Sequence, residues 1–342
     1  MEESNLTLAE LGWKPFYSSQ LSAEEARDCR PVRVMAVHRG MVAVLGEGFD
    51  RSISSVLDES RGPEDRATVG DWLLLARNSE RVVRILDRTS LFKRPSPGNS
   101  HRLQLIAANV DTLFIVTSCN QDFSIARIER YLVLAREVGV KPVVVLTKLD
   151  LADAPERFLE AVRELELEVE MIDARDPASV AHLAIRCGTG ETVALVGSSG
   201  VGKSTLINTL RGSHSIATQP VREADGKGRH TTTVREMHRL GRGAAGGGWL
   251  VDTPGMRELQ LSDATAGLAE VFDDIVAMAR ECRFTNCTHA AEPDCAIQIA
   301  IASGSLGPAR LERWRKLTAE ESVNNGNIAA RRLPAGKRDK RK

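Results

Sequence analysis

Residues 197–204, Gly-Ser-Ser-Gly-Val-Gly-Lys-Ser, have the composition and spacing of a loop that binds nucleotide phosphates. Glycines let the backbone N–H groups of such a loop turn towards phosphate oxygens, and the following helix adds the positive end of its dipole. Lys203 is predicted to reach the β- and γ-phosphates, and the Ser204 hydroxyl to bind Mg²⁺. The predicted phosphate-binding residues here are Gly197, Ser198, Ser199, Gly200, Val201, Gly202, Lys203, Ser204 and Thr205. The loop by itself does not distinguish ATP from GTP.

A second motif, Thr147-Lys148-Leu149-Asp150, follows the apolar run 142–146 and is similar to the guanine-specificity motif Asn-Lys-x-Asp of GTPases. The Asp150 carboxylate would accept hydrogen bonds from guanine N1–H and the 2-amino group, and the Lys148 stem would lie along the base. Adenine offers neither donor, so ATP would leave a carboxylate unpaired at a cost of several kcal/mol. Thr147 supplies only a hydroxyl in place of the asparagine, which predicts a weaker base contact. In isolation such a tetrapeptide often has no function, but beside a phosphate loop it indicates GTP.

Two further segments match other GTPase motifs. Asp173-Ala174 is similar to the last guanine motif, in which a small residue lets a backbone N–H approach guanine O6, although Asp173 replaces the usual serine. Asp252-Thr253-Pro254-Gly255 follows a short predicted strand at 249–251 and is the stronger match. Asp252 is predicted to hold Mg²⁺ through water, and the Gly255 N–H to meet the γ-phosphate.

The residues that would drive hydrolysis are less clearly marked. Thr232, within the run 231–233, is the preferred Mg²⁺ ligand of the first switch, with its neighbours as alternatives. The position that usually holds a water-orienting glutamine is Met256, whose thioether cannot orient water. His230 is the candidate catalytic replacement, and a solvent-facing loop histidine is an equally good reading. We expect slow intrinsic turnover that rises when a partner orders this loop.

Cys282, Cys287, His289 and Cys295 lie within fourteen residues and predict a structural zinc site. Three thiolates and one imidazole complete a tetrahedron and leave no open position for catalysis. The alternatives are three unpaired cysteines, or a ligand set that recruits a distant residue such as His238. The surrounding module has little core of its own, so the metal would contribute much of its folding energy.

The elements that would position these motifs alternate between strand and helix, which predicts a parallel α/β sheet with crossover helices. A glycine-rich connector at 241–248 joins a further predicted strand pair, 234–240 and 249–251. Helices are expected again from residue 263. The expected strands are 110–117, 142–146, 169–172 and 193–196, and the expected helices are 125–135, 156–166, 178–185, 203–210, 268–279 and 309–320.

Upstream of the sheet the pattern differs. Residues 1–30 read as a loosely ordered arm, and the proline-containing segment 93–102 as a linker. Between them, turn residues separate short alternating runs, which favours a small β-barrel with an OB-fold as the leading candidate; another small barrel or a sandwich is the alternative. The expected barrel strands are 32–37, 41–45, 53–57, 72–76 and 82–86.

Both guanine motifs precede the phosphate loop, whereas ordinary GTPases run from the loop to the switches to the guanine motifs. The order therefore predicts a circularly permuted P-loop GTPase domain. It also places the second switch directly upstream of the C-terminal module, so nucleotide state could be transmitted there mechanically. The predicted divisions are an arm at 1–30, a barrel at 31–95, the GTPase domain at 96–262 and a helical zinc-binding domain with a basic tail at 263–342.

The overall composition limits the partners and the cellular location that we expect for this protein. The 342 residues carry 46 basic and 46 acidic side chains, so only local patches could attract nucleic acid. Residues 1–13 lack the features of a signal peptide, and the apolar runs are far shorter than the roughly 20 residues of a membrane helix. We expect a soluble cytoplasmic protein. The tail 331–342, with seven basic residues and one acidic residue, is a solvated terminus or a salt-sensitive phosphate-backbone contact.

Taken together, these motifs resemble the RsgA family (also called YjeQ or EngC) over nearly the whole chain. The shared features are the rotated order, the zinc spacing, Gly-Arg-His-Thr-Thr-Thr at 228–233, Asp-Thr-Pro-Gly at 252–255, Gly-Asp-Trp at 70–72 and Ala-Ala-Asn-Val at 107–110. The resemblance implies an OB-fold, a permuted GTPase domain and a zinc domain. It also implies late maturation of the small ribosomal subunit, with GTPase activity stimulated by that subunit. Thr147 and Asp173 depart from the pattern.

Three classes of function stay open on the residues. The resemblance favours a monomeric GTPase with the small ribosomal subunit, its RNA and GTP or GDP as partners, Mg²⁺ and Zn²⁺ as ions, and no membrane. A permuted GTPase acting on another ribosomal particle is the second class, against which the barrel and zinc module argue. The third is a nucleotide-gated RNA-binding module with little turnover, which Met256 makes conceivable.

Overall fold

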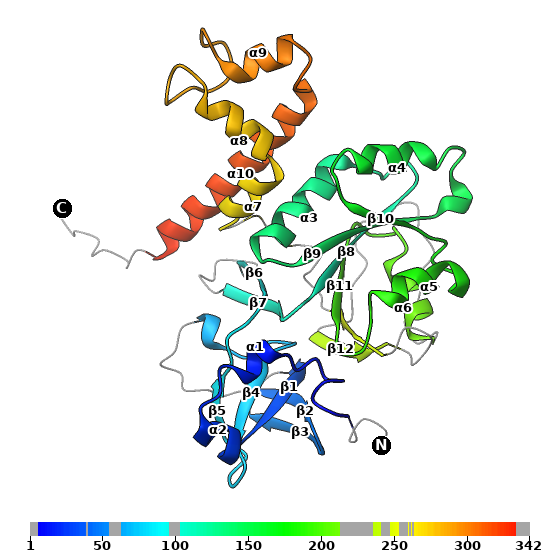
Figure 1. Ribbon diagram of the computed structural model, residues 1–342, viewed down its shortest axis with the longest axis vertical. Coiled ribbons are helices and arrows are strands. Elements are labelled where there is room, and N and C mark those ends of the chain that lie inside the picture. The colour runs from blue at the N-terminus through cyan, green and yellow to red at the C-terminus, as the bar shows by residue number, and fades with distance from the viewer. Residues whose placement is uncertain are drawn as a thin grey trace, which may run out of the picture. The chain divides into compact units, whose positions relative to one another are not determined.

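The computed structural model describes residues 6–38, 40–54, 63–95, 103–212, 235–240, 247–252, 259, 261 and 263–332. Figure 1 shows the chain coloured from the N-terminus to the C-terminus. The contacts between residues divide the chain into two compact units. The first holds residues 1–96, 102–125 and 139–259, and the second holds residues 97–101, 126–138 and 260–342.

A parallel sheet forms the centre of the first unit, in the order β10-β9-β8-β11-β13. Its strands β8, β9 and β11 are apolar and buried almost throughout, as expected for strands covered on both faces. The predicted parallel α/β sheet is confirmed. The strand bounds are β8 Thr112–Ser118, β9 Lys141–Thr147, β10 Glu168–Met171, β11 Thr192–Val196 and β13 Trp249–Asp252.

Helices α4 (Glu156–Arg163), α5 (Pro177–Ile185) and α6 (Lys203–Arg211) belong to the same unit. The Asp176 side chain caps α5 by accepting from the Ala178 N–H, and Gly212 ends α6 in the left-handed conformation. Figure 1 shows α5 and α6 side by side. Their apolar faces share one buried core with the central strands, which includes Phe114, Val143, Val145, Val180, Leu183, Val193, Leu206, Ile207 and Leu210.

The barrel segment contains β1 to β5, in which β1 pairs with β2 and β4, β2 with β3, and β4 with β5. Inward-facing residues of these strands form a second core of Val32, Val34, Val42, Val44, Phe49, Leu73 and Leu75. The pairing agrees with a five-stranded barrel, and the finer OB-fold assignment stays a prediction. The bounds are β1 Cys29–His38, β2 Met41–Gly46, β3 Phe49–Ser54, β4 Trp72–Ala76 and β5 Val82–Ile85, with a short 3₁₀ turn at Pro63–Asp65.

Two sequence predictions in this region were wrong. The third barrel strand was expected at 53–57, but it starts at Phe49 and forms a tight hairpin with β2, in which Gly46 pairs with Phe49. Its exposed residues Asp50–Ser52 hid the apolar alternation. The expected linker 93–102 begins within β6 (Leu91–Pro95), which pairs antiparallel with β7 (Leu103–Ala108).

The N-terminal arm is also better ordered than predicted. Leu6 and Leu11 are buried, and the Trp13 ring meets the Trp72 ring edge-on with centroids 4.8 Å apart. Two short helices follow, α1 (Pro15–Ser18) and α2 (Ala23–Asp28). The Ser22 and Glu25 side chains form a capping box at the start of α2, a signal that the sequence carried as Ser-x-x-Glu.

One buried ion pair explains the Gly-Asp-Trp signature. Asp71 is fully buried and accepts from Arg88 Nε at 2.7 Å, from Arg88 Nη2 at 2.8 Å and from the Thr68 N–H at 2.7 Å. Gly70 has a φ of +88°, and a Cβ there would lie 2.1 Å from Ala108 O, so only glycine fits. The signature therefore joins the barrel to the end of β7.

Strand β12 (Arg235–Arg239) connects the barrel to the central sheet. It pairs antiparallel with β13 on one edge and with β1 on the other, where Ala36 faces Glu236 and Val37 faces Arg235. The result is a single sheet of 11 strands running from β10 to β3, with β4 and β5 attached to β1. The predicted strand pair is confirmed, but its link to the barrel was not predicted.

Arg33, on β1, ties three distant segments together. Arg33 is 1% exposed, and its guanidinium donates to Leu11 O at 2.6 Å, to Thr192 Oγ1 at 2.7 Å and to Asn109 O at 3.3 Å. Burial lowers the pKa of this guanidinium. The buried Arg33 guanidinium thus links the barrel to the N-terminal arm and to the start of β11.

The second unit is helical. The single helix expected at 268–279 is two helices, α7 (Thr265–Val271) and α8 (Asp273–Arg280), separated at the fully buried Phe272. The other helices are α3 (Ile125–Glu137), α9 (Ala296–Ala302) and α10 (Pro308–Arg332). Glu129 on α3 is fully buried and accepts from Arg313 Nε at 2.6 Å and Nη2 at 3.0 Å.

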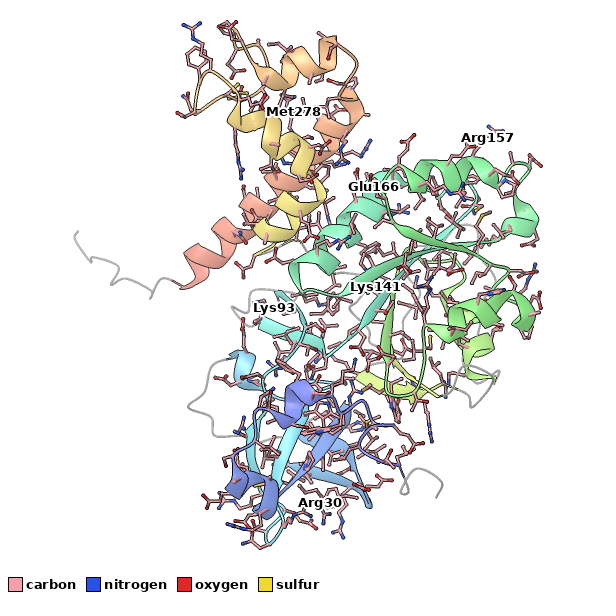
Figure 2. All side chains as sticks on the ribbon, viewed as in Figure 1. Arg30, Lys93, Lys141, Arg157, Glu166 and Met278 are labelled. Carbon is pink, nitrogen blue, oxygen red and sulfur yellow. The ribbon has the colours of Figure 1, made fainter. Side chains whose placement is uncertain are left out.

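Helix α10 is longer than the predicted 309–320 and continues to Arg332. The added turns include Asn324 and Asn325, which have low intrinsic helix propensity. Their side chains make tertiary contacts instead: Asn324 donates to Leu261 O at 2.6 Å, and Asn325 Oδ1 accepts from the Asp263 N–H at 2.8 Å. Figure 2 labels Met278 on α8 of the same unit. No helix in the described part of the chain combines the length and the apolar character needed to cross a bilayer.

We predict that Arg33→Met lowers the free energy of unfolding by about 3 kcal/mol, because three buried acceptors lose their donor. Urea unfolding followed by tryptophan fluorescence measures this, since Trp72 lies beside the Arg33 guanidinium. Arg27→Met is the control, because Arg27 is exposed and pairs only with the adjacent Asp28 among the interactions of the described residues. Equal unfolding midpoints for the two variants would contradict the bridging role of Arg33.

Candidate functional site

The carboxyl ends of the parallel strands gather the predicted nucleotide residues. The chain runs outward from β8 through β9 to β10 and then returns to β11, which pairs with the other edge of β8. In open α/β sheets, ligands bind beyond the carboxyl ends at such a reversal. Figure 2 labels Lys141 at the amino end of β9, so this residue marks the end of the sheet opposite to the nucleotide residues.

The phosphate loop leaves β11 and enters α6 as predicted. Gly197 has a φ of +141°, and a Cβ at this position would lie 2.1 Å from Val116 O on the neighbouring strand β8. A side chain would therefore push the loop away from the sheet. Gly202 is the N-cap of α6 with a φ of 96°, so the loop residues end at a helix N-terminus, where backbone N–H groups are unpaired.

Lys203 is the first residue of α6, and its side chain is folded against the loop. The ammonium donates to Gly197 O at 2.8 Å and also to Ser198 O. Lys203 is 6% exposed, and lysines are rarely this buried unless the charge has partners. Here the partners of the ammonium are carbonyl oxygens of the loop. Ser204, next along the helix, is half-buried.

Thr147 connects the guanine motif to the phosphate loop. It ends β9 and is fully buried, and its hydroxyl donates to Val201 O at 2.6 Å, with Thr117 O 3.2 Å away. From the sequence, we expected Thr147 to make a weaker contact with the base than the usual asparagine. In the structure its hydroxyl holds the loop instead, so the departure from asparagine keeps a hydrogen-bonding role.

Asp150 lies just beyond Thr147, in a 3₁₀ turn that Lys148 begins with a left-handed φ of 58°. Its Oδ2 accepts from Arg175 Nη2 at 2.6 Å. Arg175 also donates its backbone N–H at 3.0 Å and its Nε at 3.3 Å to Asp173 Oδ1. That N–H and the guanidinium hold the pKa of Asp173 below its usual range, and the two carboxylates raise the pKa of Arg175.

The last guanine motif is also attached to α6. Ala174 O accepts from Thr209 Oγ1 at 2.7 Å, and the Asp173 N–H donates to Ser179 Oγ at 2.9 Å. A Cβ on Gly202 would have both Thr147 and Ala174 atoms within 4.0 Å. The motif predicted from Asp173-Ala174 therefore lies beside the phosphate loop.

The structure brings most of the predicted nucleotide residues to this edge. Asp252 ends β13, next to β11, and is half-buried. Gly255, His230 and Thr232 lie outside the described residues, so their predicted roles stay predictions. Arg175 was not predicted to take part, although a basic residue two positions after Asp173 was a usable signal.

Cys119, which follows β8 at the same edge, offers no nucleophile. Its backbone N–H donates to Thr147 O at 2.9 Å, so the residue fixes the ends of β8 and β9. Burial raises the pKa of its thiol to about 11. The thiol is therefore neutral near pH 7 and packs as a small apolar group.

In the second unit, the predicted zinc ligands are together. One ligand atom from each of Cys282, Cys287, His289 and Cys295 lies within 4.8 Å of the others. Cys282 Sγ is 3.9 Å from Cys295 Sγ, and His289 Nδ1 is 3.5 Å and 3.7 Å from these two sulfurs. Around tetrahedral Zn²⁺, sulfurs lie about 3.8 Å apart and sulfur and nitrogen about 3.6 Å apart. The residues present therefore fit the ion, with Nδ1 as the imidazole ligand.

Neighbouring groups hold the histidine ligand in place. His289 has a positive φ of 59°, and its carbonyl accepts from Arg315 Nη2 at 2.6 Å. The Glu292 carboxylate accepts from Thr288 on the preceding turn, and these hydrogen bonds lower the pKa of Glu292 to about 2. The ligand loop is thus fixed by its own polar contacts, as expected around a structural metal.

Known proteins match this chain over most of its length. The model of the RsgA GTPase family matches residues 85–262. A Mesorhizobium japonicum protein named small ribosomal subunit biogenesis GTPase RsgA is 48% identical over 326 residues, covering 94% of this chain and 92% of that protein. A Vibrio vulnificus protein named small ribosomal subunit biogenesis GTPase RsgA 2 is 45% identical over 330 residues, covering 95% and 91%.

Solved structures share the fold. YjeQ from Thermotoga maritima is 26% identical with a TM-score of 0.58, covering 85% of this chain and 98% of that one. YloQ, described as a circularly permuted GTPase, has a TM-score of 0.59 at 22% identity, covering 92% and 100%. The predicted α/β fold with rotated motif order is confirmed.

We predict that Thr147→Val destabilises the first unit by about 1–3 kcal/mol and weakens GDP binding, because Val201 O loses its buried donor. Thr147→Ser is the matched control, since it retains the hydroxyl. Urea unfolding without nucleotide and calorimetric titration with GDP measure the two effects. If the serine and valine variants behave alike, the hydroxyl does not hold the loop.

We predict one bound zinc ion per chain, lost in Cys282→Ser and retained in Cys29→Ser, because Cys29 lies on β1 of the first unit and is not one of the four clustered ligands. Atomic emission spectroscopy of purified protein measures the ratio. Chelation of the zinc should reduce helical circular dichroism, since metal binding contributes to folding of such modules. Unchanged zinc content in Cys282→Ser would overturn the assignment.

Proposed function

The chain belongs to the RsgA GTPase family and is a GTPase of ribosome biogenesis, and from this premise we propose that it binds the small ribosomal subunit and assists its late maturation. Its relatives in Mesorhizobium and Vibrio are named for biogenesis of that subunit. The proposed reaction is hydrolysis of GTP to GDP and phosphate, stimulated by the bound subunit.

The observation that carries the assignment to GTP is the hydrogen bond from Thr147 Oγ1 to Val201 O. It joins the motif that would select guanine to the loop that would bind phosphates. One ligand that has both a guanine base and a phosphate chain satisfies the two parts of the site together. ATP would place adenine against Asp150 and leave that carboxylate without its two donors.

Each residue then has a proposed role. Asp150 reads the guanine edge, Lys148 lies along the base, and the Asp173-Ala174 backbone approaches O6. The loop N–H groups, Lys203 and Gly255 hold the phosphates. Ser204, Asp252 and Thr232 offer the oxygen ligands that Mg²⁺ prefers, and the ion would neutralise charge on the β- and γ-phosphates.

Hydrolysis is proposed to be slow in the free enzyme. Met256 replaces the usual glutamine, and its thioether cannot orient the attacking water. His230 is the proposed group that accepts a proton or hydrogen bond from that water when the subunit is bound. This role fits the expected stimulation by a partner.

The remaining parts of the proposal concern the rest of the chain. Cys282, Cys287, His289 and Cys295 would hold one Zn²⁺, which would stabilise the C-terminal helices. We retain the division into an arm (1–30), an OB-fold (31–95), a GTPase domain (96–262) and a zinc-binding domain (263–342). We also propose that the protein is a cytoplasmic monomer and that its basic tail, 331–342, contacts ribosomal RNA.

The test is GTP hydrolysis measured with and without purified small subunits, with ATP as the control nucleotide. We expect a rise of at least about tenfold with small subunits, and no comparable rise with large subunits or with ATP. His230→Ala should lose most of the stimulated rate. Stimulation by large subunits would indicate another ribosomal particle, and no turnover under any condition would indicate a binding module.

A further inference from the structure

Two carboxylates lie where a guanine motif normally supplies one. Asp150 is the proposed guanine acceptor, and Asp173 replaces the usual serine of the last motif. Arg175 contacts both, through Nη2 to Asp150 Oδ2 at 2.6 Å and through Nε to Asp173 Oδ1 at 3.3 Å. A single guanidinium thus bridges the two motifs.

The charges explain why this bridge is needed. With the usual serine at position 173, Asp150 would give the site a net charge of −1. In this chain Asp150, Asp173 and Arg175 together also carry −1. Without Arg175 the same place would carry −2 beside an anionic nucleotide. Repulsion between the carboxylates would then favour rotation of Asp150 away from the base.

We propose that Arg175 is a positioning residue for guanine recognition, which holds the Asp150 carboxylate and neutralises Asp173. The inference rests on the proposed role of Asp150 in GTP binding. Arg175 donates to only one oxygen of Asp150 among the described contacts, so Oδ1 remains available for guanine, and Oδ2 has a second lone pair. Arg175 therefore supports the acceptor and does not compete for it.

The contacts are exposed, which separates this role from a structural one. The Arg175 side chain is 64% exposed and those of Asp150 and Asp173 are 36% and 35% exposed. Exposed ion pairs contribute little to folding. Removal of Arg175 should therefore change nucleotide affinity while the urea midpoint stays the same.

The experiment compares Arg175→Ala, Asp173→Ser and the double variant by calorimetric titration with GDP and with IDP. IDP lacks the 2-amino group and so makes one bond to Asp150 where GDP makes two. We expect Arg175→Ala to weaken GDP binding about fivefold to tenfold and IDP binding less, so that selectivity for GDP falls. In the Asp173→Ser background the same substitution should cost less than about twofold.

Two further variants serve as controls for this experiment. Arg175→Lys should restore part of the affinity, and Arg163→Ala, an exposed arginine at the end of α4, should change nothing. Tighter GDP binding in Arg175→Ala would show competition, and an equal loss in both backgrounds would show that Asp173 is not the charge being neutralised; either result overturns the proposal. If Asp150→Ala leaves GDP over IDP selectivity intact, the proposed guanine site itself fails.

Discussion

The parallel pairing of β8 with β11 is the contact on which the nucleotide site depends. It places Thr112 beside Val193 and Ile115 beside Val196, so strands far apart in the sequence end at one edge. The next pairing, β8 with β9, brings Thr147 to the same edge. Because the site needs only this adjacency, the order in which the chain visits the strands is free. That freedom is the physical basis of the rotated motif order.

Much of this arrangement could be predicted from the sequence, because the signals are local. The buried strands β8, β9 and β11 are unbroken apolar runs, and the loop glycines, Lys203 and the cysteine cluster are recognisable by spacing alone. Parallel strands end at a common edge, so residues that follow different strands were expected to meet. The positions of Asp150, Asp173 and Asp252 agree with that expectation.

Features that depend on long-range partners could not be predicted. The polar side chains of β3 hid its pairing with β2, and the prolines around β6 concealed its pairing with β7. The arm folds because Trp249 Nε1 donates to Glu10 O at 2.8 Å and because Arg33 binds Leu11 O. No local pattern indicates such partners. The bridging role of Arg175 likewise became visible only when two separate motifs lay side by side.

The position of β12 between two partners limits how this protein can change during evolution. A residue inserted in or deleted from a strand reverses the faces of every side chain beyond it. In β12 such a change would turn the buried Met237 outward and break register with both β1 and β13. Point substitutions can accumulate in the barrel and in the GTPase sheet independently. The length of the strand that they share is fixed by both, so it should be inherited without insertions or deletions.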